Sequence, residues 1–233
     1  MSFCAFLWQK NLWLVIGSKK PSHGRARPSQ TGFVAKPKTI GAGEIHAAIE
    51  RLATAISQRH PGPEKLVLLG IANGGIELAR RLALRISKGL PSAPRLSAIA
   101  LAAAEPSPSS LPSLSVPAGT LDISFHRDDI GRHPIPKEFA PTRIPVDVHG
   151  ATVIIVDDVL FSGRTVKAAL DELFDHGRPA KVELAILVDR GGRRLPFAPD
   201  YCGLTLDAAE KEKVVVVLDP ASPAKDSITL RPS

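Results

Sequence analysis

The chain has 233 residues, of which 44% are hydrophobic, enough for one domain with a buried core and an additional terminal segment. It contains no apolar run of the length that a bilayer requires, so no membrane span is predicted. Its two cysteines, Cys4 and Cys202, fit neither a disulfide framework nor a zinc site, and we therefore expect a cytoplasmic protein.

The formal net charge of +7 is carried by the N-terminal segment. Residues 1–43 contain seven of the 30 basic residues and no acidic residue. The remaining 23 basic residues are balanced by 23 acidic residues. The charge of the remaining chain therefore gives no indication of nucleic-acid binding.

Residues 1–40 are expected to form a basic extension outside the domain. Their apolar stretch precedes the basic cluster, an order that does not fit a secretory signal. The Ser, Pro, Gly, Lys and Arg residues that follow are typical of disordered segments. Two interpretations remain open: an RNA-binding arm, or a segment absent from the cellular protein because translation starts near Val34.

The domain is predicted to span residues 41–220 and to begin with an amphipathic helix. The apolar residues of this helix recur with helical spacing: Ile45, Ala48, Ile49, Leu52, Ala53 and Ile56. A buried strand at 65–71 follows, then the loop Asn73-Gly74-Gly75 and a second helix ending near Gly89. Two glycines let a backbone approach an anion closely, so the loop is a candidate diphosphate site, although an ordinary strand–helix turn has the same pattern.

The middle of the chain is less regular. Strands are expected at 95–101 and 119–125, with a Ser- and Pro-rich insertion at 103–118. Residues 127–150 contain many prolines and charges, which suits a flexible hood that closes over an active site. Further strands are expected at 181–188 and 213–218, followed by a C-terminal tail at 221–233.

The most informative segment is VIIVDDVLFSGRT, residues 153–165. Its apolar start predicts a buried parallel strand that ends in Asp157 and Asp158. A helix then begins at Arg164 and ends before Gly177, with one apolar face made of Val166, Ala169, Leu170, Leu173 and Phe174. The loop before this helix suits a phosphate, because free backbone N–H groups meet there. Carboxylates beside a phosphate site indicate that the ligand is a sugar phosphate. The carboxylates would accept hydrogen bonds from the hydroxyl groups of the sugar.

The alternation of strands and helices predicts an α/β fold with a central parallel sheet flanked by helices. Open sheets of this class bind ligands at the carboxyl ends of their strands. We therefore expect the glycine loop and the two aspartates to lie at one site.

Segment 153–165 resembles the phosphoribosyl pyrophosphate (PRPP) signature of type I phosphoribosyltransferases. The segments DISFHRDD (122–129), IPVD (144–147), GRP (177–179) and LVDRG (187–191), followed by Leu195-Pro196 and Asp200-Tyr201, resemble the PyrR family of pyrimidine-operon attenuators and uracil phosphoribosyltransferases. The resemblance runs from about residue 44 to about residue 220. It implies the type I phosphoribosyltransferase fold, formation of UMP and diphosphate from uracil and PRPP, and Mg²⁺ carried mainly by PRPP. A homo-oligomer is also expected.

The resemblance also implies roles for individual residues. Asp157 and Asp158 would hold the ribose hydroxyls, and Arg127 would close over the diphosphate, although a salt bridge with Asp128 or Asp129 explains Arg127 equally well. The implied PRPP-binding residues are Val159, Leu160, Phe161, Ser162, Gly163, Arg164 and Thr165, together with Asn73, Gly74 and Gly75. The implied base-binding residues are Val188, Asp189, Arg190 and Gly191.

Two departures from the family pattern leave three functional hypotheses open. The loop Asn73-Gly74-Gly75 stands where the family usually has Thr-Arg-Gly, and the missing arginine removes a charged contact with diphosphate. Among the expected RNA contacts, Arg51 keeps its charge, but Leu204 replaces a lysine. The hypotheses are a uracil phosphoribosyltransferase of the bifunctional type, an RNA-binding attenuator of pyrimidine genes that senses UMP and PRPP with weak catalysis, and a transferase for another base.

Overall fold

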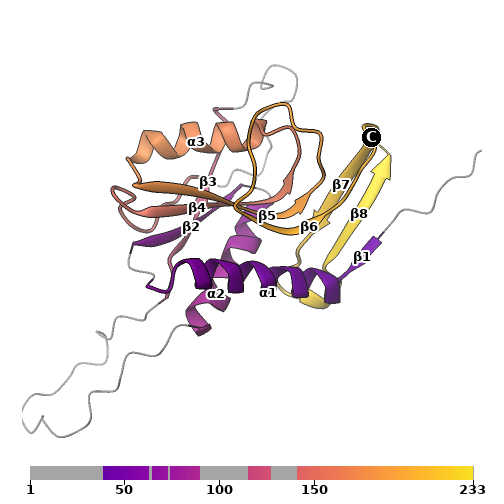
Figure 1. Cartoon of the computed structure of the whole chain (residues 1–233), viewed down its shortest axis with the longest axis horizontal. Helices are drawn as coiled ribbons and strands as arrows, with labels where there is room; N and C mark the ends of the chain where they lie inside the picture. Colours follow the sequence, from indigo (N-terminus) through magenta and orange to yellow (C-terminus); the bar gives the residue numbers. More distant parts are fainter. Residues whose placement is uncertain (1–38, 63–64, 73, 90–114, 127–140, 233) are drawn as a thin grey trace, which may run out of the picture. The chain divides into compact units, whose positions relative to one another are not determined.

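The computed structural model describes residues 39–62, 65–72, 74–89, 115–126 and 141–232 (Figure 1). All of them belong to the unit Pro37–Ser233. Within this part of the chain, no helix is long and apolar enough to cross a membrane.

A five-stranded parallel sheet forms the centre of the domain, in the order β3-β2-β4-β5-β6. Its strands are β2 (Leu66–Ile71), β3 (Ala118–Leu121), β4 (Thr152–Leu160), β5 (Lys181–Asp189) and β6 (Tyr201–Thr205). The predicted central parallel sheet is therefore confirmed.

Helices cover both faces of this sheet. The helices α1 (Ala42–Arg59) and α2 (Gly75–Gly89) lie on one face, and α3 (Arg164–His176) lies on the other (Figure 1). Successive side chains of β2 point to opposite faces of the sheet. Leu66 and Leu68 pack with α1 and α2, whereas Val67 and Leu69 pack with α3. Coverage on both faces explains why the central strands are almost continuously apolar.

The predicted helix faces agree with the structure except at one position. All six apolar residues predicted for α1 are buried, and α3 begins at Arg164 and ends before Gly177 as predicted. Phe174 was expected to be buried, but 40% of it is exposed. It lies at the margin of the apolar stripe, where the Arg178 guanidinium is 5.6 Å from the centroid of its ring.

A second, antiparallel sheet was not predicted. It consists of β1 (Thr39–Gly41), β8 (Ser227–Pro232) and β7 (Glu212–Val217), in the order β1-β8-β7. The strand expected at 213–218 is β7, but it does not join the parallel sheet, because the chain turns back through the short 3₁₀ helix η1 (Pro223–Lys225) and pairs β7 with β8. Residues 39–40 and 227–232 thus form strands of the domain, although they were assigned to the extension and to the tail.

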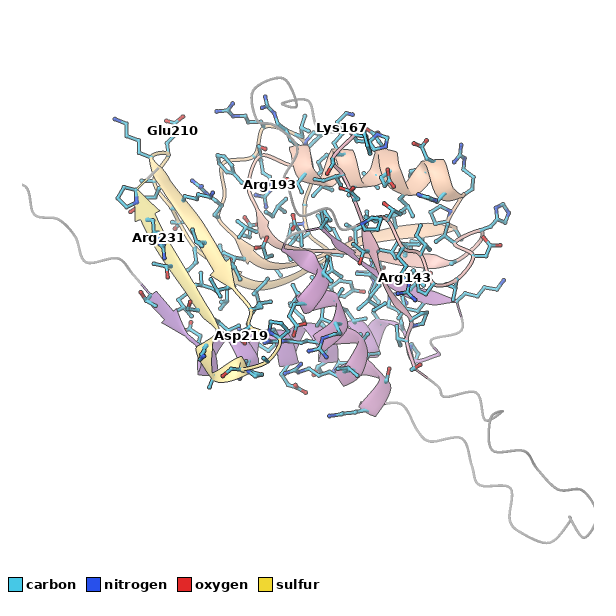
Figure 2. The ribbon with its side chains drawn as sticks, turned by 180° about the vertical axis from the view of Figure 1, so that it is seen from behind. Arg143, Lys167, Arg193, Glu210, Asp219 and Arg231 are labelled. Atoms are coloured by element: carbon cyan, nitrogen blue, oxygen red, sulfur yellow. The ribbon has the colours of Figure 1, made fainter. Side chains whose placement is uncertain are left out.

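A buried ion pair attaches the second sheet to the helices. The Arg81 guanidinium of α2 donates to the carboxylate of Asp226, whose side chain is fully buried, and also to the carbonyl oxygen of Asp219 at 2.7 Å. His46 of α1 lies 2.9 Å from the same carboxylate. Asp219 marks the connection between β7 and β8 (Figure 2). These contacts fix the end of β7 relative to α2.

The middle of the chain differs from the prediction in two described places. The strand expected at 119–125 is shorter and ends at Leu121, because the Asp122 carboxylate accepts hydrogen bonds from the backbone and hydroxyl of Ser124 and forms a turn. Arg143 of the expected hood forms an antiparallel bridge with Thr120 at the sheet edge. The strand expected at 95–101 and residues 127–140 of the hood lie outside the described residues, as does most of the insertion.

Candidate active site

The predicted site segments converge at the carboxyl ends of β2, β4 and β5. β2 and β5 both pair with β4, so the residues that follow each strand lie at one edge of the sheet. Leu160 pairs with Asp189, and the backbone N–H of Arg190 donates to the carbonyl oxygen of Leu160 at 3.1 Å. The segment expected to bind PRPP and the segment expected to bind a base are therefore adjacent.

The glycine loop lies directly against β4. A Cβ atom at Gly75 would be 2.0 Å from the carbonyl oxygen of Val156, and one at Gly74 would be 2.5 Å from Cγ of Asp158. No side chain fits at such distances, so glycine at both positions allows the start of α2 to approach the two aspartates. Asn73 lies outside the described residues.

The two aspartates have different environments. Asp157 is 5% exposed, and its carboxylate accepts a hydrogen bond of 3.0 Å from the backbone N–H of Asp158. Burial, together with the nearby Asp158 charge, raises the pKa of Asp157 well above the usual carboxyl value. Burial also raises the pKa of Asp158. Hydroxyl donors or a cation bound here would offset the cost of ionising both groups.

The loop before α3 is held by the segment that follows β5. The carbonyl oxygen of Ser162 accepts hydrogen bonds from the backbone N–H groups of Arg194 at 3.1 Å and Leu195 at 2.9 Å. Gly163 precedes the helix with a φ of 90°, a left-handed conformation that favours glycine. This conformation lets the chain turn sharply into α3, whose first N–H groups form the candidate phosphate site.

The predicted base-binding segment has its side chains engaged in the protein. The Asp189 carboxylate accepts hydrogen bonds from the backbone of Gly191 at 2.9 Å and from Arg193 at 2.5 Å. The buried Arg190 guanidinium lies 4.1 Å from the centroid of the Phe161 ring. These side chains fix the loops, so contacts with a base would have to come from the backbone of this segment.

Arg193 was missed by the sequence analysis. Besides Asp189, it donates to the carbonyl oxygens of Leu160, Phe161 and Phe197 at 3.0–3.3 Å (Figure 2). It therefore connects the ends of β4 and β5. Its spacing of four residues from Asp189 was the one available signal, but carbonyl partners leave no pattern in a sequence.

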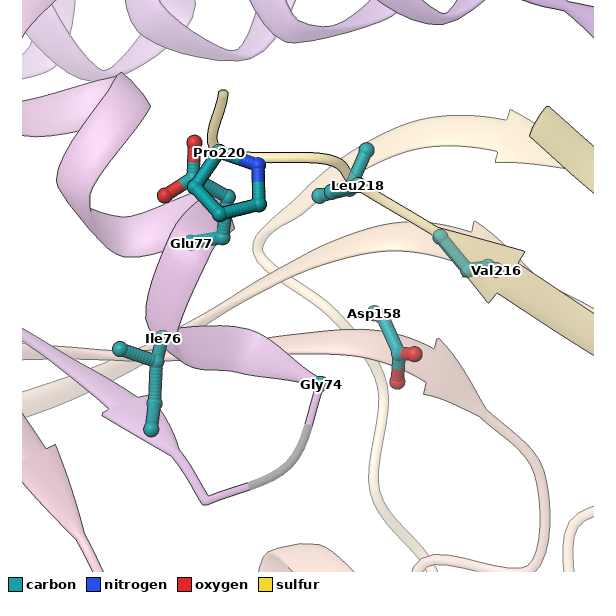
Figure 3. A pocket seen from close by; sticks show the side chains of 7 residues that line it. All are labelled: Gly74, Ile76, Glu77, Asp158, Val216, Leu218 and Pro220. Carbon is teal, nitrogen blue, oxygen red and sulfur yellow. The ribbon is translucent and has the colours of Figure 1, made fainter. Parts of the chain in front are cut away.

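A pocket of about 290 Å³ opens beside Asp158. Figure 3 shows the Asp158 carboxylate with Gly74 on one side and Val216 on the other. The lining residues come from the start of α2, from β4 and from the second sheet: Gly74, Ile76, Glu77, Asp158, Val216, Leu218 and Pro220. The last three were not predicted as site residues, because their position depends on how the second sheet packs.

The described part of the expected hood lies elsewhere. Residues 144–148 line a different pocket together with His176, which is in the last turn of α3. That position is at the opposite end of α3 from the candidate phosphate loop. Arg127 lies outside the described residues.

Comparison with known proteins identifies the family. Residues 41–221 match the model of the phosphoribosyl transferase domain. The bifunctional protein PyrR of Deinococcus radiodurans is 41% identical over 186 residues, which cover 78% of this chain and 88% of the relative. The bifunctional protein PyrR 1 of Lactiplantibacillus plantarum is 40% identical over 186 residues, covering 78% of this chain and 90% of the relative. The chain belongs to the PyrR family of phosphoribosyltransferases.

Solved structures support the fold of this PyrR-family chain. The hypoxanthine phosphoribosyltransferase of Trypanosoma cruzi aligns with a TM-score of 0.54 at 19% identity, covering 83% of this chain and 95% of that one. A hypoxanthine-guanine phosphoribosyltransferase from Bacillus anthracis aligns with a TM-score of 0.52 at 19% identity, covering 74% and 86%. At this level of identity the likeness concerns the fold alone, and it confirms the predicted type I phosphoribosyltransferase fold.

Proposed function

We propose that the chain transfers the phosphoribosyl group of PRPP to N1 of uracil and releases diphosphate. The observation that carries this proposal is the contact between Gly74 and Asp158. It joins the loop expected to hold the diphosphate to the carboxylates expected to hold the ribose, at the rim of one pocket.

Two helix N-termini flank the proposed ribose site. α2 begins at Gly75 after β2, and α3 begins at Arg164 after the neighbouring β4. The two helices cover opposite faces of the sheet, so their free N–H groups lie on either side of the β4 end. The 5′-phosphate would bind at α3 and the diphosphate at α2, with the ribose between them over Asp157 and Asp158.

This arrangement suits the charges that develop during transfer. The bond between C1 and the diphosphate oxygen breaks while the bond to uracil N1 forms, the N1 proton passes to the released diphosphate or to solvent, and the ribose ring is cationic in the transition state. The carboxylates of Asp157 and Asp158 would stabilise the ring, and the N–H groups at Gly74 and Gly75 would stabilise the leaving group. The backbone of residues 188–191 would orient the base.

Mg²⁺ fits the same site. Asp157 and Asp158 offer oxygen ligands of the kind that Mg²⁺ prefers, and their raised pKa values show that burial disfavours two uncompensated charges. Bound together with PRPP, the ion would neutralise part of the negative charge on the leaving diphosphate. We expect the enzyme to act in the cytoplasm and to form a homo-oligomer.

RNA attenuation is a second proposed function. The curated relatives carry the name bifunctional protein, and the resemblance assigns RNA binding as the second activity. The transferase function is better supported, because the motifs that serve it meet in one site, whereas Leu204 replaces an expected basic contact.

A product assay tests the proposal. The purified protein is incubated with PRPP, Mg²⁺ and each nucleobase in turn, and nucleotide formation is followed by chromatography. UMP should form from uracil and should require PRPP. Faster turnover of another base would favour the third hypothesis, and no turnover with any base would favour an attenuator without catalysis.

A further inference from the structure

A cluster of histidines and carboxylates lies at the C-terminal end of α3. His126 Nε2 is 3.0 Å from Glu172 Oε2 and 3.5 Å from Asp175 Oδ2. One donor atom from each of these three residues lies within 4.8 Å of the other two. The cluster is separate from the candidate phosphate site, because α3 has 13 residues and is therefore about 20 Å long.

The fold holds these residues in place. Glu172 and Asp175 are three positions apart on α3 and so project from the same face, while His126 comes from the segment after β3. The other oxygen of Glu172 accepts a hydrogen bond of 2.5 Å from the Thr142 hydroxyl and lies 3.1 Å from His176 Nε2. These contacts hold the Glu172 carboxylate in one orientation.

The donor set suits a divalent transition metal. With the imidazole neutral, the form in which it binds metals, His126, Glu172 and Asp175 carry two negative charges. Tetrahedral Zn²⁺ with bonds of about 2.0–2.1 Å places its ligand atoms about 3.3 Å apart. The two separations from His126 Nε2, 3.0 and 3.5 Å, bracket that value, and the ligand atoms of Glu172 and Asp175 lie within 4.8 Å of each other, so side-chain adjustment would complete the site. An imidazole donor favours Zn²⁺ or Co²⁺ over Mg²⁺.

We propose that His126, Glu172 and Asp175 bind one divalent transition-metal ion of the Zn²⁺ type, with Thr142 and His176 orienting Glu172. This site is distinct from the one proposed above for Mg²⁺.

Calorimetric titration of the full chain with Zn²⁺, after removal of metals by a chelator, tests the site. His126→Ala and Asp175→Asn should each weaken the site by at least about tenfold, the lower end of what even outer-shell changes cause. His149→Ala is the matched control, because His149 is exposed and does not belong to the cluster, and it should leave affinity unchanged. Circular dichroism checks that each variant is folded. Equal affinity of the wild type and both cluster variants, or no Zn²⁺ binding by the wild type, would overturn the proposal.

Paramagnetic NMR locates the ion independently of transferase activity. With ¹⁵N-labelled histidine, one equivalent of Co²⁺ should shift or broaden the ring signals of His126 and His176 first, and an excess of Mg²⁺ should not reverse the effect. Thr142→Val should reduce Zn²⁺ affinity by about ten- to 100-fold, because it removes the hydrogen bond that orients Glu172. Paramagnetic effects confined to other histidines would place the ion elsewhere and overturn the assignment.

Discussion

The carboxylate of Asp158 occupies the space beside Gly74 that any larger residue would need. A Cβ atom at position 74 would lie 2.5 Å from both Cγ and Oδ1 of Asp158. Two motifs that are more than 80 positions apart in sequence are therefore matched to each other sterically, and this match leads to the first prediction.

Gly74→Ala should reduce kcat/KM by roughly 100-fold, the cost of displacing a catalytic group by about 1 Å. The new methyl group would push Asp158 or the start of α2 away from its place. Gly43→Ala is the matched control, because nothing lies within 4 Å of a Cβ at that position. Initial-rate kinetics with PRPP and uracil measure both variants. Wild-type kinetics in Gly74→Ala would show that the contact is not needed for transfer.

Asp157→Ala and Asp158→Ala should each weaken transition-state binding by about 1.5–3 kcal/mol, the range for a hydrogen bond to a charged group. This corresponds to a loss of roughly ten- to 150-fold in kcat/KM. Asp171→Asn, which disrupts an exposed pair with Lys167, should leave the kinetics unchanged. Unaltered turnover in both site variants would remove the ribose assignment.

Asp226→Asn should lower the free energy of unfolding by about 3 kcal/mol, because it leaves the buried Arg81 with a single charged partner, Glu77. The exposed pair between Arg85 and Glu50 supplies the control, and Glu50→Gln should cost less than about 1 kcal/mol. Urea unfolding compares the free energies of unfolding of the two variants, provided that the dependence of this free energy on urea concentration is the same for both. If Asp226→Asn were no less stable than Glu50→Gln, the buried ion pair would not be what holds the second sheet.

The sequence predicted the elements whose signal is local. β4 and α3 follow from an apolar run and from a change to helical spacing within one segment, and both were predicted almost to their ends. Asp157 and Asp158 could be assigned to the carboxyl edge for the same reason, because a buried strand continues directly into them.

The second sheet shows where this reasoning ends. β1 has three residues, too few for a periodic pattern, and its partner β8 lies about 190 positions away in the chain. Residues 213–218 were recognised as a strand, but their antiparallel pairing depends on the turn that Asp226 and Arg81 hold. Val216 and Leu218 therefore could not be assigned to the pocket from sequence.

Acid should destabilise the domain partly through Glu183. Burial alone would raise the pKa of this fully buried side chain, but hydrogen bonds from Lys181, Tyr201 and His60 lower it from 4.5 to about 2. A lowered folded-state pKa stabilises the protein above the unfolded value, and the contribution is lost as pH falls from about 4.5 to about 2. It is worth about 3 kcal/mol at neutral pH.

Glu183→Gln tests this linkage. The variant should be less stable than the wild type at pH 7, and the difference should shrink as pH falls from 4.5 toward 2. Urea midpoints at several pH values give the comparison, with Glu50→Gln as the exposed control. A difference that stays constant over this range would show that the charge of Glu183 does not contribute.

The folded domain from Thr39 onward should bind pyrimidine-leader RNA weakly. Its basic and acidic residues balance, and two of its arginines are engaged within the protein: Arg51 donates to the carbonyl oxygen of Gly203, and Arg193 holds the ends of two strands. Strong binding by the full chain should come from residues 1–38, tolerate changes in RNA sequence and fall steeply with salt. The seven basic residues of the N-terminal segment limit the slope of log K against log salt to roughly −5.

Fluorescence anisotropy with leader and scrambled RNA, for the full chain and for residues 39–233, measures these properties. Tight, sequence-specific binding by residues 39–233 at physiological salt would contradict the prediction and favour the attenuator hypothesis for the folded domain.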